Sequence, residues 1–285
     1  MLYTSKIEDM YALEAVSLEA NFLSNAANAV MQFFPSMLKA ISSGFSQIAS
    51  LTPFKFASSD ASSFLSPLEL NIQKALQETS YLELTKFRVT VPEGLNRDYL
   101  GYAKDLINVF DYHEKIAYPA IVNYYTQIAA IITNKDSALS VKDNTSEYTS
   151  LKKAKDALND TLSSPFQTKS NSQVLAYEKA FKDNNEVIEL FKVRHQLLKA
   201  LQGVDIGSVQ KLSTQISDSL KVLIDSVRNG TITTLSSAQL KNLTAGAYEI
   251  AQQLEFFAVN YHRVQILAQS VVFTQESLKT RLGIK

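Results

Sequence analysis

The side chains best suited to acid–base or metal chemistry are the three histidines, because the chain has no cysteine. His113 is the most notable, since Asp111 and Glu114 flank it in the segment FDYHEK. A histidine and two carboxylates can hold a metal ion or move a proton when all three side chains converge. On a helix, however, these positions spread around the circumference. The spacing therefore predicts no metal site at His113.

The other two histidines, His195 and His262, each lie on an apolar stripe of a predicted helix. A histidine in such a stripe is more often a hydrogen-bonded core or interface residue than a catalytic group. We therefore interpret both as structural. The stripes are Ile188, Phe191 and Leu198 for His195, and Val259, Ile266 and Phe273 for His262.

The motifs of common enzyme and metal sites are missing from the chain. It contains no Glu-x-x-His pair, no His-Glu-x-x-His string, no glycine-rich phosphate loop and no Gly-x-Ser-x-Gly elbow. Two of its eight glycines, in QGVDIG at 202–207, fit a connection between helices. The sequence thus predicts a protein that is not an enzyme, with no catalytic, cofactor-binding or metal-binding residues and no cofactor.

The charge balance and the N-terminal composition limit the classes of partner and the location that we expect. The 28 basic residues balance the 28 acidic residues, whereas a nucleic-acid-binding surface usually needs a basic excess. We therefore expect no specific nucleic-acid partner. The first fifteen residues include acidic side chains and no continuous apolar segment, so we expect no signal peptide and a protein made in the cytoplasm.

The distribution of prolines divides the chain into two regions. All six lie at or before Pro165, and each restricts helix continuation. We therefore divide the chain into a proline-punctuated helical region at 1–165 and a region of long helices at 166–285 that packs on it. The two regions could also form one continuous domain.

Most of the first region is expected to be helical. Ser66 is a plausible cap for a helix that begins with Pro67 near its first position. A later helix is expected to be interrupted or restarted at Pro119. The predicted helices are 5–33, 36–50, 67–80, 96 or 98 to 117, 119–133 and 146–162.

Three long helices are predicted in the second region, at 172–202, at 206–228 and from Ser236 onward. Ser236 and Gln239 form a capping box at the start of the last helix. Apolar residues then recur at alternating steps of four and three, a heptad stripe about 60 Å long. This periodicity predicts a mainly α fold, a bundle of long antiparallel helices with a minor short β segment. The stripe is Leu243, Ala247, Ile250, Leu254, Phe257, Tyr261, Val264, Ala268, Val271, Gln275, Leu278 and Leu282.

One stretch has the period of a β-strand. At 86–92 the apolar residues Phe87, Val89 and Val91 alternate with polar ones until Pro92. A strand needs a partner for its backbone groups. The expected partners are PFKF at 53–56, TITT at 231–234 or a neighbouring subunit, and the alternative is an extended linker.

Two uncharged or nearly uncharged stretches leave a membrane role open. Residues 116–133 carry no charge, and residues 33–59 carry only two lysines among several phenylalanines. Either could contact lipid. A buried central helix and a segment packed on protein explain the same patterns, and we favour those interpretations.

A family resemblance rests on residues 87–134, FRVTVPEGLNRDYLGYAKDLINVFDYHEKIAYPAIVNYYTQIAAIITN. The segment resembles helical virion structural proteins of large tailed bacteriophages, in which a V-P-x-G turn precedes an amphipathic helix and a proline-containing helix. The chain's lack of cysteine and tryptophan is similar as well. The resemblance implies a virion component, and it carries over no functional residues.

We therefore expect a structural or assembly protein of a multi-subunit particle, located in the virion, whose head, neck or tail placement is open. The alternatives are a membrane-active helical protein acting through 33–59 and 116–133, and an adaptor inside a bacterial cell. The expected partners are other structural proteins of the particle, with a second copy of the chain as a further candidate. The candidate interaction residues are Phe87, Val89, Val91, Leu254, Phe257 and Tyr261.

Overall fold

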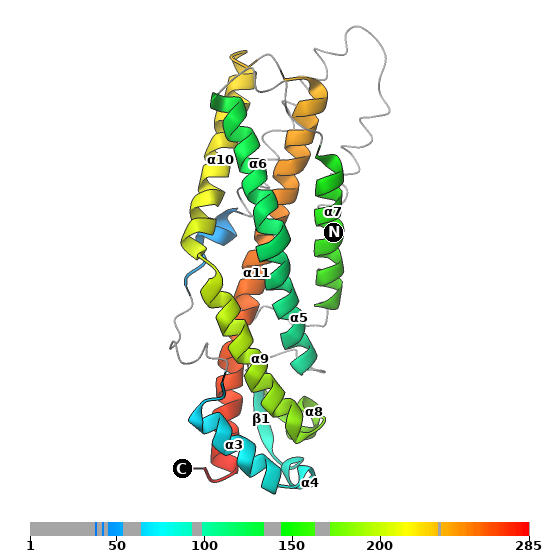
Figure 1. Ribbon diagram of the computed structural model, residues 1–285, viewed down its shortest axis with the longest axis vertical. Coiled ribbons are helices and arrows are strands. Elements are labelled where there is room, and N and C mark those ends of the chain that lie inside the picture. The colour runs from blue at the N-terminus through cyan, green and yellow to red at the C-terminus, as the bar shows by residue number, and fades with distance from the viewer. Residues whose placement is uncertain are drawn as a thin grey trace.

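Long helices from both regions of the chain lie side by side along one axis in the computed structural model (Figure 1). The structure describes residues 38, 42, 45–53, 64–92, 99–133, 144–162, 172–232 and 235–284. The predicted helix at 5–33 lies outside these residues, and the one predicted at 36–50 is helical at the positions described between 38 and 49. The prediction of a mainly α fold with a minor β segment is confirmed.

Three consecutive segments form one nearly continuous rod: α5 (Tyr99–Tyr112), the π-helical turn η3 (His113–Ala117) and α6 (Tyr118–Thr133). The break predicted at Pro119 is replaced by this wider turn. Proline has no N–H and its ring crowds the carbonyl four residues before it, which an ordinary helix cannot accommodate without a kink. In η3 the N–H of Tyr118 instead bonds the carbonyl of His113, five residues back.

A second rod consists of α9 (Asn184–Gly203) and α10 (Ile206–Arg228). Asp183 caps α9 by accepting hydrogen bonds from two backbone N–H groups, and Asp205 caps α10 in the same way with one. α9 packs against α5, and α10 packs most closely against α6. The bundle is therefore built jointly by the two predicted regions, and one hydrophobic core includes side chains from both.

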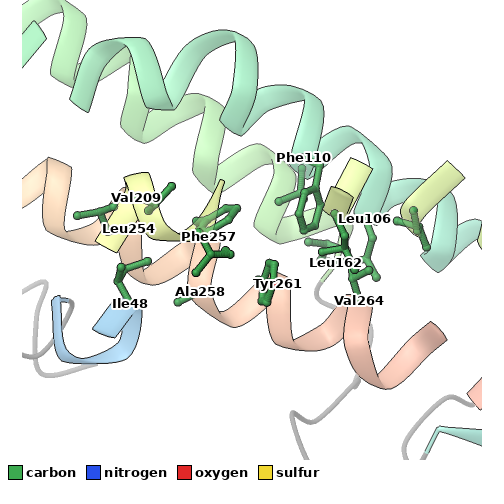
Figure 2. Packing of buried hydrophobic residues seen from close by; sticks show 14 of the residues in the cluster. Ile48, Leu106, Phe110, Leu162, Val209, Leu254, Phe257, Ala258, Tyr261 and Val264 are labelled. Carbon is green, nitrogen blue, oxygen red and sulfur yellow. The ribbon is translucent and has the colours of Figure 1, made fainter. Parts of the chain in front are cut away.

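The longest helix, α11 (Ser237–Arg281), extends along the length of the bundle and is antiparallel to the α5–α6 and α9–α10 rods (Figure 1). Its 45 residues span about 68 Å at 1.5 Å per residue. The predicted capping box of Ser236 and Gln239 is present. The predicted heptad stripe is buried from Leu243 to Leu278. Figure 2 shows Leu254, Phe257, Tyr261 and Val264 among the packed side chains of this seam.

α7 (Thr145–Thr161) packs along α11, and the ring of its Tyr148 lies against Gly246. A Cβ atom on Gly246 would lie 2.6 Å from the Tyr148 ring and 2.7 Å from that of Tyr124. Glycine at this position lets both rings lie against the backbone of α11. The Tyr124 hydroxyl then donates a hydrogen bond of 2.7 Å to the carbonyl of Leu243.

Small elements gather at the end of the bundle where α11 ends (Figure 1). There Ser66 caps α3 and Pro67 occupies its first turn, as predicted, and Glu69 completes a capping box with Ser66. The prediction of one helix over 172–202 was wrong, because its first five residues form a strand and Asp183 starts the long helix only at Asn184. The elements of this end are α3 (Pro67–Glu78), α4 (Tyr81–Leu84), β1 (Arg88–Pro92), β2 (Ser172–Ala176) and α8 (Tyr177–Ala180).

Candidate interaction surface

β1 and β2 form a two-stranded antiparallel ribbon that crosses between the two predicted regions of the chain. Val89 lies opposite Leu175, and Thr90 lies opposite Val174. The predicted strand is therefore present, beginning two residues later than expected at Arg88. β1 pairs with β2, which was not among the predicted partners. Thr231 and Ile232 lie outside the sheet, 54–56 lie outside the described residues, and pairing with a neighbouring subunit stays a prediction.

The alternation predicted for the strand holds where its side chains are described. Val89 is buried and Phe87 is half-buried against the core, whereas Lys86 and Arg88 are exposed. The side chain of Val91 lies outside the described part. Phe87 and Val89 thus help to seat the ribbon on the helices, and this packing leaves Val89 inaccessible to a partner.

The outer edge of β1 is covered by α11. The N–H of Tyr177 donates to the carbonyl of Phe87 at 2.9 Å, so residues 87, 89 and 91 exchange hydrogen bonds with β2. The carbonyls of Arg88 and Thr90 consequently point the other way. They accept hydrogen bonds from the hydroxyls of Ser277 (3.1 Å) and Thr274 (2.8 Å).

The outer edge of β2 has no such cover among the described elements. The same alternation directs the N–H and C=O of Val174 away from β1. No described residue bonds them, and among the described elements β2 packs mainly against β1 and α8. The Val174 side chain is 56% exposed. Within the described part of the chain, the ribbon therefore has one covered edge and one edge whose backbone groups have no partner.

Exposed apolar side chains gather at this same end of the molecule. The described part of the chain exposes nine large apolar side chains, and six of them lie at this end. They belong to β2, to α3 and the turn before it, to α4 and to residues 272–273 of α11. Leu82 is 75% exposed and Phe273 is 53% exposed. Such gatherings mark protein or membrane contact sites more often than isolated exposed residues do. The six are Phe64, Leu70, Leu82, Val174, Val272 and Phe273.

A buried polar cluster fixes α3 to the long helices beside this surface. The carboxylate of Glu69 is fully buried, and its Oε2 lies 2.8 Å from Nε2 of His195 on α9. Its Oε1 accepts a hydrogen bond of 2.5 Å from Gln275 on α11, and Oε2 also accepts one of 2.6 Å from the N–H of Ser66. The structural interpretation of His195 is therefore supported, and the polar Gln275 in the heptad stripe has a partner.

The charge state of Glu69 follows from these contacts. Burial would raise the pKa of its carboxyl, because a charge is poorly solvated there. The hydrogen bonds from His195 and the Ser66 backbone outweigh burial, so the pKa lies below its ordinary value. The ionised carboxylate is thus the acceptor that holds three elements together.

The other candidate interaction residues lie within the chain's own core. Leu254, Phe257 and Tyr261 are each at most 2% exposed. Phe257 packs edge-on against Phe110 of α5, with ring centroids 5.9 Å apart. These three side chains stabilise the bundle, so no partner can reach them while the bundle is folded.

His113 and His262 lie in different surroundings, one buried and one exposed. His113 is buried, its ring stacks on Phe257 with centroids 3.9 Å apart, and its Nε2 has no hydrogen-bond partner among the described residues. Burial lowers its pKa to about 4, so it is neutral near pH 7. His262 was predicted to lie in a core or interface, but its side chain is exposed and pairs with Gln265 on the same helix. The apolar stripe assigned to it is also exposed at Phe273.

A hollow of about 340 Å³ lies between α7 and α11. Its charged side chains are largely paired within the protein: Lys155 donates a hydrogen bond of 2.5 Å to Gln252 and lies 3.7 Å from Asp156, and Arg263 donates to Asn260. No reactive set of side chains converges there. In the described ranges no group of three or more His, Asp or Glu side chains could hold a metal ion.

The membrane alternative had two candidate segments. Residues 116–133 form the end of η3 and α6, and α6 buries Ile121, Tyr124, Ile128 and Ile131 in the bundle. Most of 33–59 lies outside the described residues. None of the described helices is both long enough and apolar enough to cross a membrane.

Sequence reasoning missed β2, the strand whose outer edge has no cover among the described elements. A signal for it was present further along the chain. Asp183 and Glu186 form a reciprocal cap in which the Asp183 carboxylate accepts from the N–H of Glu186 and the Glu186 carboxylate accepts from the N–H of Lys182. This cap places the helix start at Asn184 and leaves 172–176 free to form a strand.

Comparison of the chain with protein-family models, with curated proteins and with solved structures finds no match.

Proposed function

We propose that this chain is a non-enzymatic structural or assembly subunit of a multi-subunit particle. The particle favoured by the resemblance of residues 87–134 is the virion of a tailed bacteriophage. The subunit contacts its neighbours through the end of the bundle that carries the ribbon. This proposal covers the class of function and the contact surface, and the neighbouring proteins are other structural components of the particle.

The observation that carries the proposal is the gathering of exposed apolar side chains at the ribbon end. Apolar surface in contact with water is costly at roughly 25 cal/mol per Å². Leu82 on α4 and Phe273 on α11 are far apart in the sequence, yet both are exposed, and the neighbouring Thr274 bonds Thr90 of β1 at the ribbon end. A neighbouring subunit that covers these side chains removes them from water, and this burial favours assembly of the particle.

The rest of the fold suits a subunit whose contact surface is held rigidly relative to the bundle. α11 links the ribbon end to the opposite end of the bundle in one uninterrupted helix. The buried cluster of Glu69, His195 and Gln275 fixes α3 relative to α9 and α11. A contact surface held in this way keeps its shape before a partner arrives, which reduces the entropic cost of binding.

Mass spectrometry of purified particles from the source tests the proposal directly. We expect the chain at a reproducible copy number in the particles. In a complementation assay, Leu82→Lys and Phe273→Lys should fold normally and fail to enter particles. Val222→Lys is the matched control, because Val222 is exposed on α10, which packs against α6 and is not one of the elements of the ribbon end, and it should enter particles normally.

Two outcomes would overturn the proposal. One is the absence of the chain from purified particles. The other is clear co-flotation of the purified chain with liposomes, lost in Phe273→Lys, because it would assign the exposed apolar side chains to lipid instead of protein.

A further inference from the structure

Among the described residues nothing covers the outer edge of β2, and the chemistry of this edge indicates a partner. Outward-facing groups of an edge strand pair readily with another strand, and proteins usually protect such edges with charges, proline or a covering element. β1 has all of these protections: Arg88 is exposed on it, Pro92 ends it and α11 covers it. β2 has the sequence SQVLA, without charge, proline or glycine.

We propose that β2 pairs antiparallel with β2 of a second copy of this chain across a two-fold axis at Val174. The ribbons of two subunits then form one four-stranded sheet in the order β1-β2-β2-β1. This inference rests on the assembly role proposed above and names one of its contacts. The surface is isologous, meaning that the same residues face each other from both copies.

The register of the dimer follows from the register of the ribbon. The backbone N–H and C=O groups of residues 173 and 175 are directed toward β1, so those of Val174 are directed outward. Val174 therefore exchanges two hydrogen bonds with Val174 of the second copy. Two residues further along, the N–H of Ala176 faces the carbonyl of Ser172 in the other copy. The two Val174 side chains form a cross-strand pair of β-branched residues, which is favourable in sheets.

Charge is compatible with a second copy as the partner. The five residues of β2 carry no charge, so their pairing with themselves brings no like charges together. The chain as a whole has a formal net charge of +0, so two copies do not repel each other over long range. A strongly charged strand from another protein would gain nothing from this edge beyond backbone hydrogen bonds.

Cysteine cross-linking of the full chain tests the axis. The chain has no cysteine, so Val174→Cys introduces the only thiol, and directly opposed residues in a hydrogen-bonded pair have Cα atoms about 5.5 Å apart, within disulfide reach. We expect a covalent dimer on mild oxidation of Val174→Cys. Val222→Cys, which is exposed on α10, is the matched control and should remain monomeric on denaturing gels.

Sedimentation velocity tests the hydrogen bonds. Val174→Pro removes the outward N–H of both copies without touching the bonds to β1, and should weaken dimerisation about tenfold to a hundredfold with an unchanged helical circular dichroism spectrum. Val174→Thr keeps the N–H and should dimerise like the natural chain. Equal dimerisation of Val174→Pro and the natural chain, or a natural chain that stays monomeric, would overturn the proposal.

Failure here is distinguishable from failure of the proposed function. A chain that is found in particles and does not cross-link at residue 174 refutes the β2 contact alone. A chain that cross-links at residue 174 and is absent from particles refutes the particle role alone.

Discussion

The middle of the bundle and its ribbon end use apolar residues in opposite ways. In the middle, Phe257 and its neighbours on α11 are sealed between helices from both regions of the chain. At the ribbon end, Phe273 on the same helix is 53% exposed, and the buried carboxylate of Glu69 lies between α3, α9 and α11. The comparison indicates that the middle provides stability, whereas the end provides a defined shape and a surface for contacts.

The largest effect should come from a charge in the middle. Phe257→Asp places an unpaired carboxylate among apolar side chains, which costs several kcal/mol or about the whole stability of a typical domain. We expect loss of the cooperative unfolding transition in thermal and denaturant melts. Phe273→Asp on the same helix should change the unfolding free energy by less than about 1 kcal/mol. Similar losses for both variants would remove the distinction between the two parts of α11.

His113 makes the middle sensitive to acid. Its pKa is lowered from 6.5 to about 4 in the folded chain. The folded state therefore disfavours the protonated ring, so this contribution to stability is complete above about pH 6.5 and is lost as the pH falls toward 4. The difference corresponds to about 3 kcal/mol. The unfolding free energy of His113→Leu, measured over pH 4–7, should decrease less steeply than that of the natural chain, and equal slopes would contradict the assignment.

At the ribbon end, the largest effect should follow from the buried carboxylate. Glu69→Gln keeps the shape of the side chain and removes the charge that accepts from His195 and Gln275, at an expected cost of about 2–3 kcal/mol. Since the pKa of Glu69 is lowered in the folded chain, its contribution is present above its ordinary value near 4.5 and is lost as the pH falls below it. Chemical denaturation at pH 7 and at lower pH measures both effects.

An exposed carboxylate provides the control for Glu69. Glu83 on α4 is exposed, and Glu83→Gln should leave the unfolding free energy nearly unchanged. If Glu69→Gln were as mild as Glu83→Gln, the buried cluster would not be what fixes α3 to the bundle.

The smallest effect concerns the cover on β1. Thr274→Val is nearly isosteric and leaves the carbonyl of Thr90 without its hydroxyl donor, which should cost about 1 kcal/mol. Hydrogen exchange should accelerate at the amides of Val89 and Leu175 more than in the long helices. Thr280→Val, at an exposed position of the same helix, should leave those amides unaffected. Unchanged exchange in Thr274→Val would mean that α11 does not hold the ribbon.

The sequence by itself determined the long helices and their buried faces. The four-and-three spacing from Leu243 to Leu278 specifies which side of α11 is buried, because local geometry places those residues on one face whatever the partner. The capping residues at Ser66, Asp205 and Ser236 specify where helices begin for the same local reason. The exposure of His262 and Phe273 was not predictable from this pattern, because a stripe does not state how far the neighbouring helices extend.

Only the tertiary structure decided the partner of the strand and the polar contacts between distant segments. β1 and β2 are separated by about eighty residues, and pairing over such a distance depends on the helices that bring the strands together. Likewise, Glu69 meets His195 and Gln275 through contacts 126 and 206 residues apart in the chain. Such contacts leave no periodic signal, since each residue type is explained only by the side chain that it faces.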